Sequence, residues 1–218
     1  MHREEACRII RAIGIVPAVR VASAEDAVFA AEAVAAAGIP VVEITMTVPG
    51  AVQVIAQLTR RHPNLVAGAG TVLTLEVARQ CVDAGASFLT APGLDAEIVE
   101  FAVKANVAAL PGALTPTEVV TAWRAGADIV KVFPCAPVGG SHYIKSLKTS
   151  LPQVPLMAAG GVNQKTAIDF ILAGAAAIGI GNELIPMDAI QQRAPDRIRE
   201  LTRRFLGYLK EGRDRMHG

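Results

Sequence analysis

The sequence predicts an α/β protein folded as a (β/α)8 TIM barrel, of the type found in class I aldolases, with an additional N-terminal helix. Two observations favour this fold: short apolar strands alternate with helical segments, and one phrase recurs where strands are expected to begin. The 218 residues, of which 52% are hydrophobic, suffice for a single barrel domain spanning 1–218. An open doubly wound sheet is the alternative, but it usually has fewer strands and a clear switch point.

The recurring phrase joins the end of a helix to the start of a strand. Its copies begin at Ala37-Gly38, Ala84-Gly85, Ala125-Gly126 and Ala173-Gly174, with Ala105-Asn106 as a variant. Glycine and asparagine adopt the left-handed conformation that ends a helix, and an apolar run follows at once, as in a buried parallel strand. The Gly and Asn positions are 47, 21, 20 and 48 residues apart, so each long interval holds two units.

Filling in the missing units gives eight strands. They are expected at 15–19, 41–45, 65–68, 88–90, 108–110, 129–133, 155–158 and 177–180. Helices are expected between them, from 24–37 through 164–173. The additional helix is expected at 4–13, and a charged helix at 196–210 ends the chain.

Composition excludes several classes of protein. Twenty-one basic and 20 acidic residues leave a net charge of +1, and only 4% of residues are aromatic, so we expect no nucleic-acid partner. The apolar stretches are too short for membrane spans, and the amino end lacks a signal-peptide pattern. Three scattered cysteines (Cys7, Cys81, Cys135) indicate a reducing cytoplasm. No metal-ligand spacing is visible, so we expect no cofactor.

Two charged residues interrupt apolar strands. Lys131 lies in the run Ile129-Val130-Lys131-Val132-Phe133, and Glu43 lies in Val41-Val42-Glu43-Ile44-Thr45. A buried ammonium costs free energy unless it is paired or neutral, and a neutral amine is the nucleophile that forms Schiff bases with carbonyls. Facing one barrel interior, the two side chains would satisfy each other. The alternatives are a solvent-facing lysine on an edge strand and a purely structural ion pair.

The other candidates follow strands, where barrel active sites lie. Arg20 ends the first strand, and Thr71 follows Gly68-Ala69-Gly70, where it either faces the substrate or caps a helix. Glycine-rich turns follow the seventh and eighth strands, where barrels of this type usually bind phosphate. The phosphate-binding candidates are Gly160, Gly161, Gly181 and Asn182.

Over nearly its whole length the chain resembles the 2-keto-3-deoxy-6-phosphogluconate (KDPG) / 4-hydroxy-2-oxoglutarate (KHG) aldolase family. The resemblance is carried by residues 15–20, 42–45, 68–73, 91–93, 111–112, 130–134 and 160–162. It implies a metal-independent class I aldolase, usually a homotrimer, acting on a small-molecule keto acid. Lys131 would form the Schiff base and Glu43 would transfer protons. Thr71 would contact the pyruvoyl carboxylate, while Phe133 and Pro92 would keep water away from the imine.

One position departs from the family pattern. Well-known members have an arginine four residues after the glutamate, where it binds the substrate carboxylate; this chain has Thr47. Related galactonate-type aldolases also lack that arginine and have one at the end of the first strand. Because a guanidinium is the best match for a carboxylate, we expect Arg20 to take this role.

The resulting expectation is reversible cleavage of a 2-keto-3-deoxy sugar acid to pyruvate and an aldehyde. Candidate substrates are 2-dehydro-3-deoxy-6-phosphogluconate and 4-hydroxy-2-oxoglutarate, with a 6-phosphogalactonate-type substrate as an alternative. A phosphosugar isomerase or epimerase would use Glu43 as base and Lys131 only electrostatically. A third alternative is a barrel that only binds a phosphorylated ligand.

Overall fold

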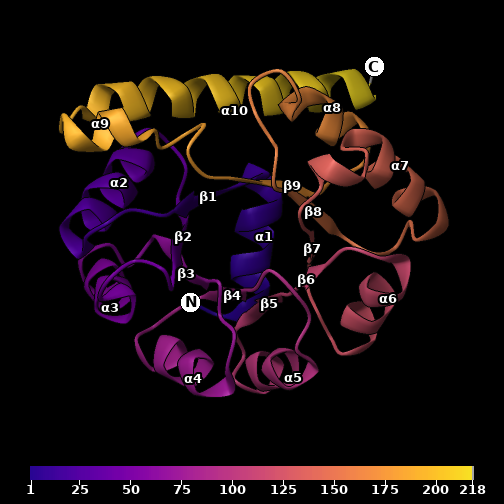
Figure 1. Ribbon diagram of the computed structural model, residues 1–218, viewed down its shortest axis with the longest axis horizontal. Helices are drawn as coiled ribbons and strands as arrows, with labels where there is room; N and C mark the ends of the chain where they lie inside the picture. The colour runs from indigo at the N-terminus through magenta and orange to yellow at the C-terminus, as the bar shows by residue number, and fades with distance from the viewer. Residues whose placement is uncertain (218) are drawn as a thin grey trace.

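The computed structural model describes residues 1–217 and is a parallel β-barrel ringed by helices (Figure 1). The strands are hydrogen-bonded in the order β5-β4-β3-β2-β1-β9-β8-β7-β6, and β5 and β6 are neighbours in the chain, so the barrel closes between them. This closure confirms the prediction of a TIM barrel rather than a doubly wound sheet. Gly218 lies outside the described residues. The strands are β1 (Ile15–Val19), β2 (Val41–Thr45), β3 (Val66–Gly70), β4 (Phe88–Thr90), β5 (Ala108–Leu110), β6 (Gly112–Ala113), β7 (Val130–Val132), β8 (Leu156–Ala159) and β9 (Ala177–Ile180).

The strand expected at 108–110 is found as β5, and a further short strand, β6, follows Pro111, which gives nine strands in the described chain. Proline has no N–H to donate to a neighbouring strand. As a result β5 pairs with β4, and β6 pairs with β7. The Pro111 carbonyl still accepts a 2.9 Å bond from the Lys131 N–H. Together, β5 and β6 therefore occupy one of the eight strand positions around the barrel. The expected bounds of β3, β7 and β8 were wrong by one or two residues.

Helices alternate with the strands, as predicted, and those after α1 lie on the outside of the barrel (Figure 1). They are α1 (Arg3–Ile13), α2 (Ala24–Ala36), α3 (Ala51–Arg61), α4 (Leu75–Asp83), α5 (Ala96–Lys104), α6 (Pro116–Arg124), α7 (Ser141–Ser150), α8 (Ala167–Leu172), α9 (Met187–Gln191) and α10 (Pro195–His217), with the 3-10 turn η1 (Ala136–Val138). The recurring Gly and Asn positions all have φ between +58° and +107°, which confirms the left-handed helix ends. Among the described helices, none has the length and apolar character of a membrane span.

Helix α8 begins three residues later than expected, and residues 164–166 form a turn that leads into it. Asn163 Oδ1 accepts hydrogen bonds from the N–H groups of Lys165 and Thr166, at 2.9 and 3.2 Å. These are the bonds that an N-cap residue makes, and the Ala167 N–H donates to the Asn163 carbonyl at 3.0 Å. Asn163 therefore caps this turn, and α8 follows from Ala167.

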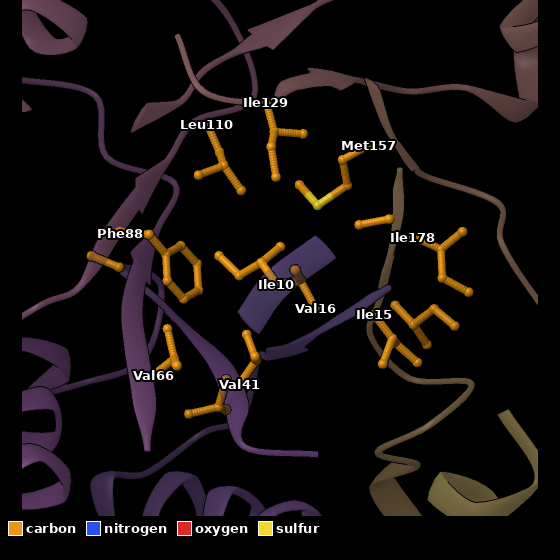
Figure 2. Packing of buried hydrophobic residues seen from close by; sticks show 14 of the residues in the cluster. Ile10, Ile15, Val16, Val41, Val66, Phe88, Leu110, Ile129, Met157 and Ile178 are labelled. Atoms are coloured by element: carbon orange, nitrogen blue, oxygen red, sulfur yellow. The ribbon is translucent and has the colours of Figure 1, made fainter. Parts of the chain in front are cut away.

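Helix α1 closes the end of the barrel at which the strands begin. Figure 2 shows Ile10 of α1 among the inward-pointing side chains of Val41, Phe88 and Ile129. Arg3 holds the helix in place through a 2.8 Å ion pair with Asp128, which also accepts the Ala109 N–H at 2.9 Å. Because α1 closes this end, the opposite end of the barrel, where the strands finish, is the end at which a ligand-binding site can open.

A close approach between two strand ends tests this packing. A Cβ added to Gly112 would overlap the backbone of Pro92, whereas a Cβ added to Gly93 would meet no atom within 4 Å. Gly112→Ala should therefore lower the free energy of unfolding by about 1–3 kcal/mol, as overpacking does. Gly93→Ala should change it by less than about 0.5 kcal/mol. Urea denaturation measures both, and equal stabilities would contradict the contact.

Candidate active site

A cavity of about 320 Å³ opens where the strands end. Its walls come from β1, β2 and β7 to β9 and from the turns that follow them. Of the sequence-predicted site residues, the structure gathers eight around this cavity: Arg20, Glu43, Lys131, Phe133, Gly160, Gly161, Gly181 and Asn182. Residues far apart in the chain thus meet at the end of the barrel where this fold places its active sites.

Lys131 and Glu43 reach each other across the barrel. They come from β7 and β2, which lie four strand positions apart in either direction around the barrel, with β5 and β6 counted as one position. Lys131 Nζ is 3.7 Å from Glu43 Oε2, and the side chains are 11% and 3% exposed. The alternative of a solvent-facing lysine on an edge strand is wrong, because β7 is paired on both sides. Removing both charges from water costs free energy that their attraction offsets only in part, so a buried ion pair is weak evidence of a purely stabilising role.

The hydroxyl of Thr90 lies beside this pair. It donates a 2.9 Å hydrogen bond to Glu43 Oε2, and Lys131 Nζ donates a 3.5 Å bond to its oxygen. Thr90 ends β4 and is only 1% exposed. Sequence reasoning missed it, although a hydroxyl two residues after the inward-pointing Phe88 shares its face and was a usable signal.

Gly70 makes room for the glutamate. It is the residue opposite Thr45 in the β2–β3 register, and a Cβ at this position would overlap the Glu43 carboxylate. Gly68 has the same relation to the ring of Phe88. The absence of a side chain at Gly70 therefore lets Glu43 lie across the barrel toward Lys131.

An aromatic ring and a guanidinium complete the inner wall and the rim. Lys131 Nζ lies 5.6 Å from the centroid of the Phe133 ring, within the range of a cation–π contact. Arg20 follows β1 and is exposed at the rim. Glu183, which follows Asn182, also lines the cavity and was not anticipated. The rim therefore combines one positive and one negative side chain.

Three predicted site residues are not among those that line the cavity. Thr47 is exposed and its Oγ1 is 2.7 Å from that of Thr45. Pro92 packs its backbone against Gly112. Thr71 is half-buried at a φ of +60°, a rare conformation for a β-branched residue. The alternative that Thr71 caps a helix is wrong, because the N-cap of α4 is Thr74, whose side chain accepts the Val77 N–H.

The cysteines are unsuited to nucleophilic chemistry at neutral pH. All three are buried, and burial raises the pKa of Cys7 to about 12 and those of Cys81 and Cys135 to about 11. A thiol with so high a pKa stays protonated at pH 7, whereas the thiolate is the reactive form. Within residues 1–217, no group of three or more His, Cys, Asp or Glu side chains is placed to hold a metal ion. Lys131 contributes an amine to the lining of the cavity.

Comparisons with known proteins agree with this arrangement. A family model described as KDPG and KHG aldolase matches residues 6–201. The KHG/KDPG aldolase of Escherichia coli K12 is 31% identical over 190 residues, which cover 87% of this chain and 89% of that protein. A KDPG aldolase from Legionella pneumophila, with pyruvate captured as a covalent carbinolamine intermediate, is 31% identical at a TM-score of 0.84 over 90% of this chain and 96% of that one. A native KDPGal structure is 29% identical at a TM-score of 0.85, covering 92% of this chain and 96% of that one.

Proposed function

Because the chain belongs to the KDPG and KHG aldolase family, we propose that it reversibly cleaves a 2-keto-3-deoxy sugar acid to pyruvate and an aldehyde through a Schiff base on Lys131. The proposed substrates are 2-dehydro-3-deoxy-6-phosphogluconate, which gives glyceraldehyde 3-phosphate, and 4-hydroxy-2-oxoglutarate, which gives glyoxylate. The observation that carries the proposal is the buried Lys131–Glu43 pair at 3.7 Å, facing the cavity. We further propose a metal-independent homotrimer in the cytoplasm.

The mechanism begins at the amine. Neutral Lys131 attacks the C2 ketone, and the resulting carbinolamine loses water to give an iminium. When a base removes the proton of the C4 hydroxyl, the C3–C4 bond breaks, its electron pair moves toward the iminium, and the aldehyde leaves. Protonation of the enamine at C3 and hydrolysis of the imine then release pyruvate. Glu43, directly or through water, is the group placed to take and return these protons.

The rim residues would orient the substrate. Apart from Lys131, Arg20 is the basic side chain among those lining the cavity. We assign to it the binding of the pyruvoyl carboxylate, because the family's usual arginine is replaced by Thr47 in this chain. The backbones of Gly160, Gly161 and Gly181, with Asn182, line the other side and suit a phosphate. Phe133 would limit water near the imine. Thr71 and Pro92, outside the cavity lining, would act only if substrate binding moves them or reaches beyond the cavity.

A galactonate-type substrate is the second candidate. Thr47 stands where well-known members of this family have arginine, Arg20 follows β1, and a KDPGal structure is among the similar folds. The two candidates differ in the configuration at C4, so turnover of the two C4 epimers compares them directly. An isomerase or epimerase on this barrel would form no covalent adduct with pyruvate.

The first test traps the Schiff base. Incubation with pyruvate and borohydride should add a pyruvate-derived mass to Lys131, because hydride reduces the imine to a stable amine. Lys131→Met should abolish both labelling and cleavage, whereas Lys104→Met, on the exposed face of α5, should behave as wild type. Peptide mass mapping locates the label, and finding it on Lys145 or Lys148 would refute the assignment. Chelators should leave turnover unchanged.

Glu43→Gln tests proton transfer. The amide keeps the shape of the carboxylate and can still accept the Thr90 hydrogen bond, but it cannot carry the proton. Turnover should fall by about 10²–10⁴-fold, the usual range for a general acid–base group. Steady-state kinetics measure the loss, with Glu97→Gln on the surface of α5 as the control. Near-normal turnover would remove Glu43 from the mechanism.

Arg20→Lys tests the carboxylate contact. A point charge loses the fork geometry of the guanidinium, and a lost hydrogen bond to a charged group costs about 1.5–3 kcal/mol, so pyruvate should bind about 10–150-fold more weakly. Titration with pyruvate measures the affinity, and Arg203→Lys, exposed on α10, is the control. If Arg20→Ala binds pyruvate as tightly as wild type, the assignment is wrong.

A further inference from the structure

The hydroxyl of Thr90 bridges Lys131 and Glu43 by two steps, each shorter than the direct separation of the two charged groups. The direct separation of Nζ and Oε2 is 3.7 Å, which is beyond hydrogen-bond length. Through Thr90 the steps are 3.5 Å from Nζ to Oγ1 and 2.9 Å from Oγ1 to Oε2. A hydroxyl both accepts and donates, so an N–H···O–H···O chain runs from the amine to the carboxylate.

The barrel holds this hydroxyl in place. Thr90 is in register with Leu110 of β5, and its carbonyl accepts the Val72 N–H at 3.1 Å, so its backbone is bonded on both sides. Thr90 is 1% exposed. Its strand, β4, lies two strand positions from both β2 and β7 around the barrel. The backbone pairing of β4 therefore fixes the position of the Thr90 hydroxyl.

We propose that Thr90 positions Glu43 and relays the proton that Lys131 must lose before it attacks a carbonyl; the inference rests on the function proposed above. In the relay, a proton of the Lys131 ammonium passes to Thr90 Oγ1 while the hydroxyl proton of Thr90 passes to Glu43 Oε2. The products are a neutral amine, an intact threonine and a protonated Glu43. The reverse transfer resets the pair when the imine is hydrolysed.

A merely structural role is the competing explanation. A buried carboxylate needs donors, and Thr90 supplies one. Removing the hydroxyl would then lower stability without slowing the chemical step. The two roles therefore separate in the rate of imine formation at saturating pyruvate, since a relay changes that rate and a structural contact changes the amount of folded protein.

The experiment compares Thr90→Val, which keeps the shape without the hydroxyl, with Thr90→Ser, which keeps the hydroxyl. Imine formation with pyruvate is followed by rapid quenching in borohydride. Thr90→Val should slow the rate at saturation about 10²-fold, as expected for a lost acid–base group, and change the half-saturating pyruvate concentration less than about threefold. Thr90→Ser should stay within about threefold of wild type. Thr90→Cys, with a weak donor, should also be slow if Thr90→Val does not fold.

A matched control removes another buried threonine hydroxyl. Thr202 is fully buried in α10, and its Oγ1 donates to the Ile198 carbonyl, so Thr202→Val should form the imine at the wild-type rate. Equal rates for Thr90→Val and wild type, or equally slow Thr90→Val and Thr90→Ser, would overturn the relay. Absence of any trapped adduct on wild-type Lys131 would instead overturn the proposed function itself.

Discussion

The pairing of Lys131 with Glu43 inside the barrel is the constraint on which the site depends. Each charge loses most of its hydration, and the mutual attraction offsets that cost only if the geometry is held and the remaining hydrogen bonds are made. The barrel meets both conditions. The two strands stand on opposite walls at fixed register, and Thr90 supplies a further bond to the carboxylate. Elsewhere in the barrel interior, Figure 2 shows apolar side chains packed together.

Space for these long side chains comes from the neighbouring strand. The inward positions of β3 include Gly68 and Gly70, and a side chain at either would occupy the volume now taken by Phe88 or Glu43. The interior of an eight-stranded barrel is only wide enough to be filled by side chains, so a long one on β2 needs a small one beside it. Gly68 is thus required by the packing of the Phe88 ring, and Gly70 by the packing of the Glu43 carboxylate.

Features that depend on local conformation were predictable from the sequence. The left-handed residues at helix ends gave the positions of the strands along the chain, because glycine or asparagine in that conformation is determined by a few neighbouring residues. The inward charges of Lys131 and Glu43 were visible because they interrupt apolar strands. The contacts of Thr90 were not, since a threonine at the end of a strand is ordinary and its partners are 41 and 47 residues away. The start of α8 was expected at the residue after Asn163, where the structure has a capped turn before the helix.

The charges around the cavity limit how a substrate with two anionic ends is held. Lys131 is paired with Glu43, so Arg20 is the remaining basic side chain among the lining residues, and Glu183 adds a negative charge at the rim. Under the proposed function, this one guanidinium would have to serve either the carboxylate or a distal phosphate. The carboxylate adjoins the carbon that Lys131 would attack, so a bidentate contact there would fix the reacting geometry.

A distal phosphate would then be left with backbone N–H groups of the glycine turns and with Asn182. Glu183 also lines the cavity, and its negative charge would oppose an anion bound on that side. Under the proposed function, the carboxylate end would therefore anchor the substrate, and the distal end would contribute less binding free energy than a phosphate bound by arginine. Such a division would suit an enzyme that accepts aldehydes differing in their distal groups.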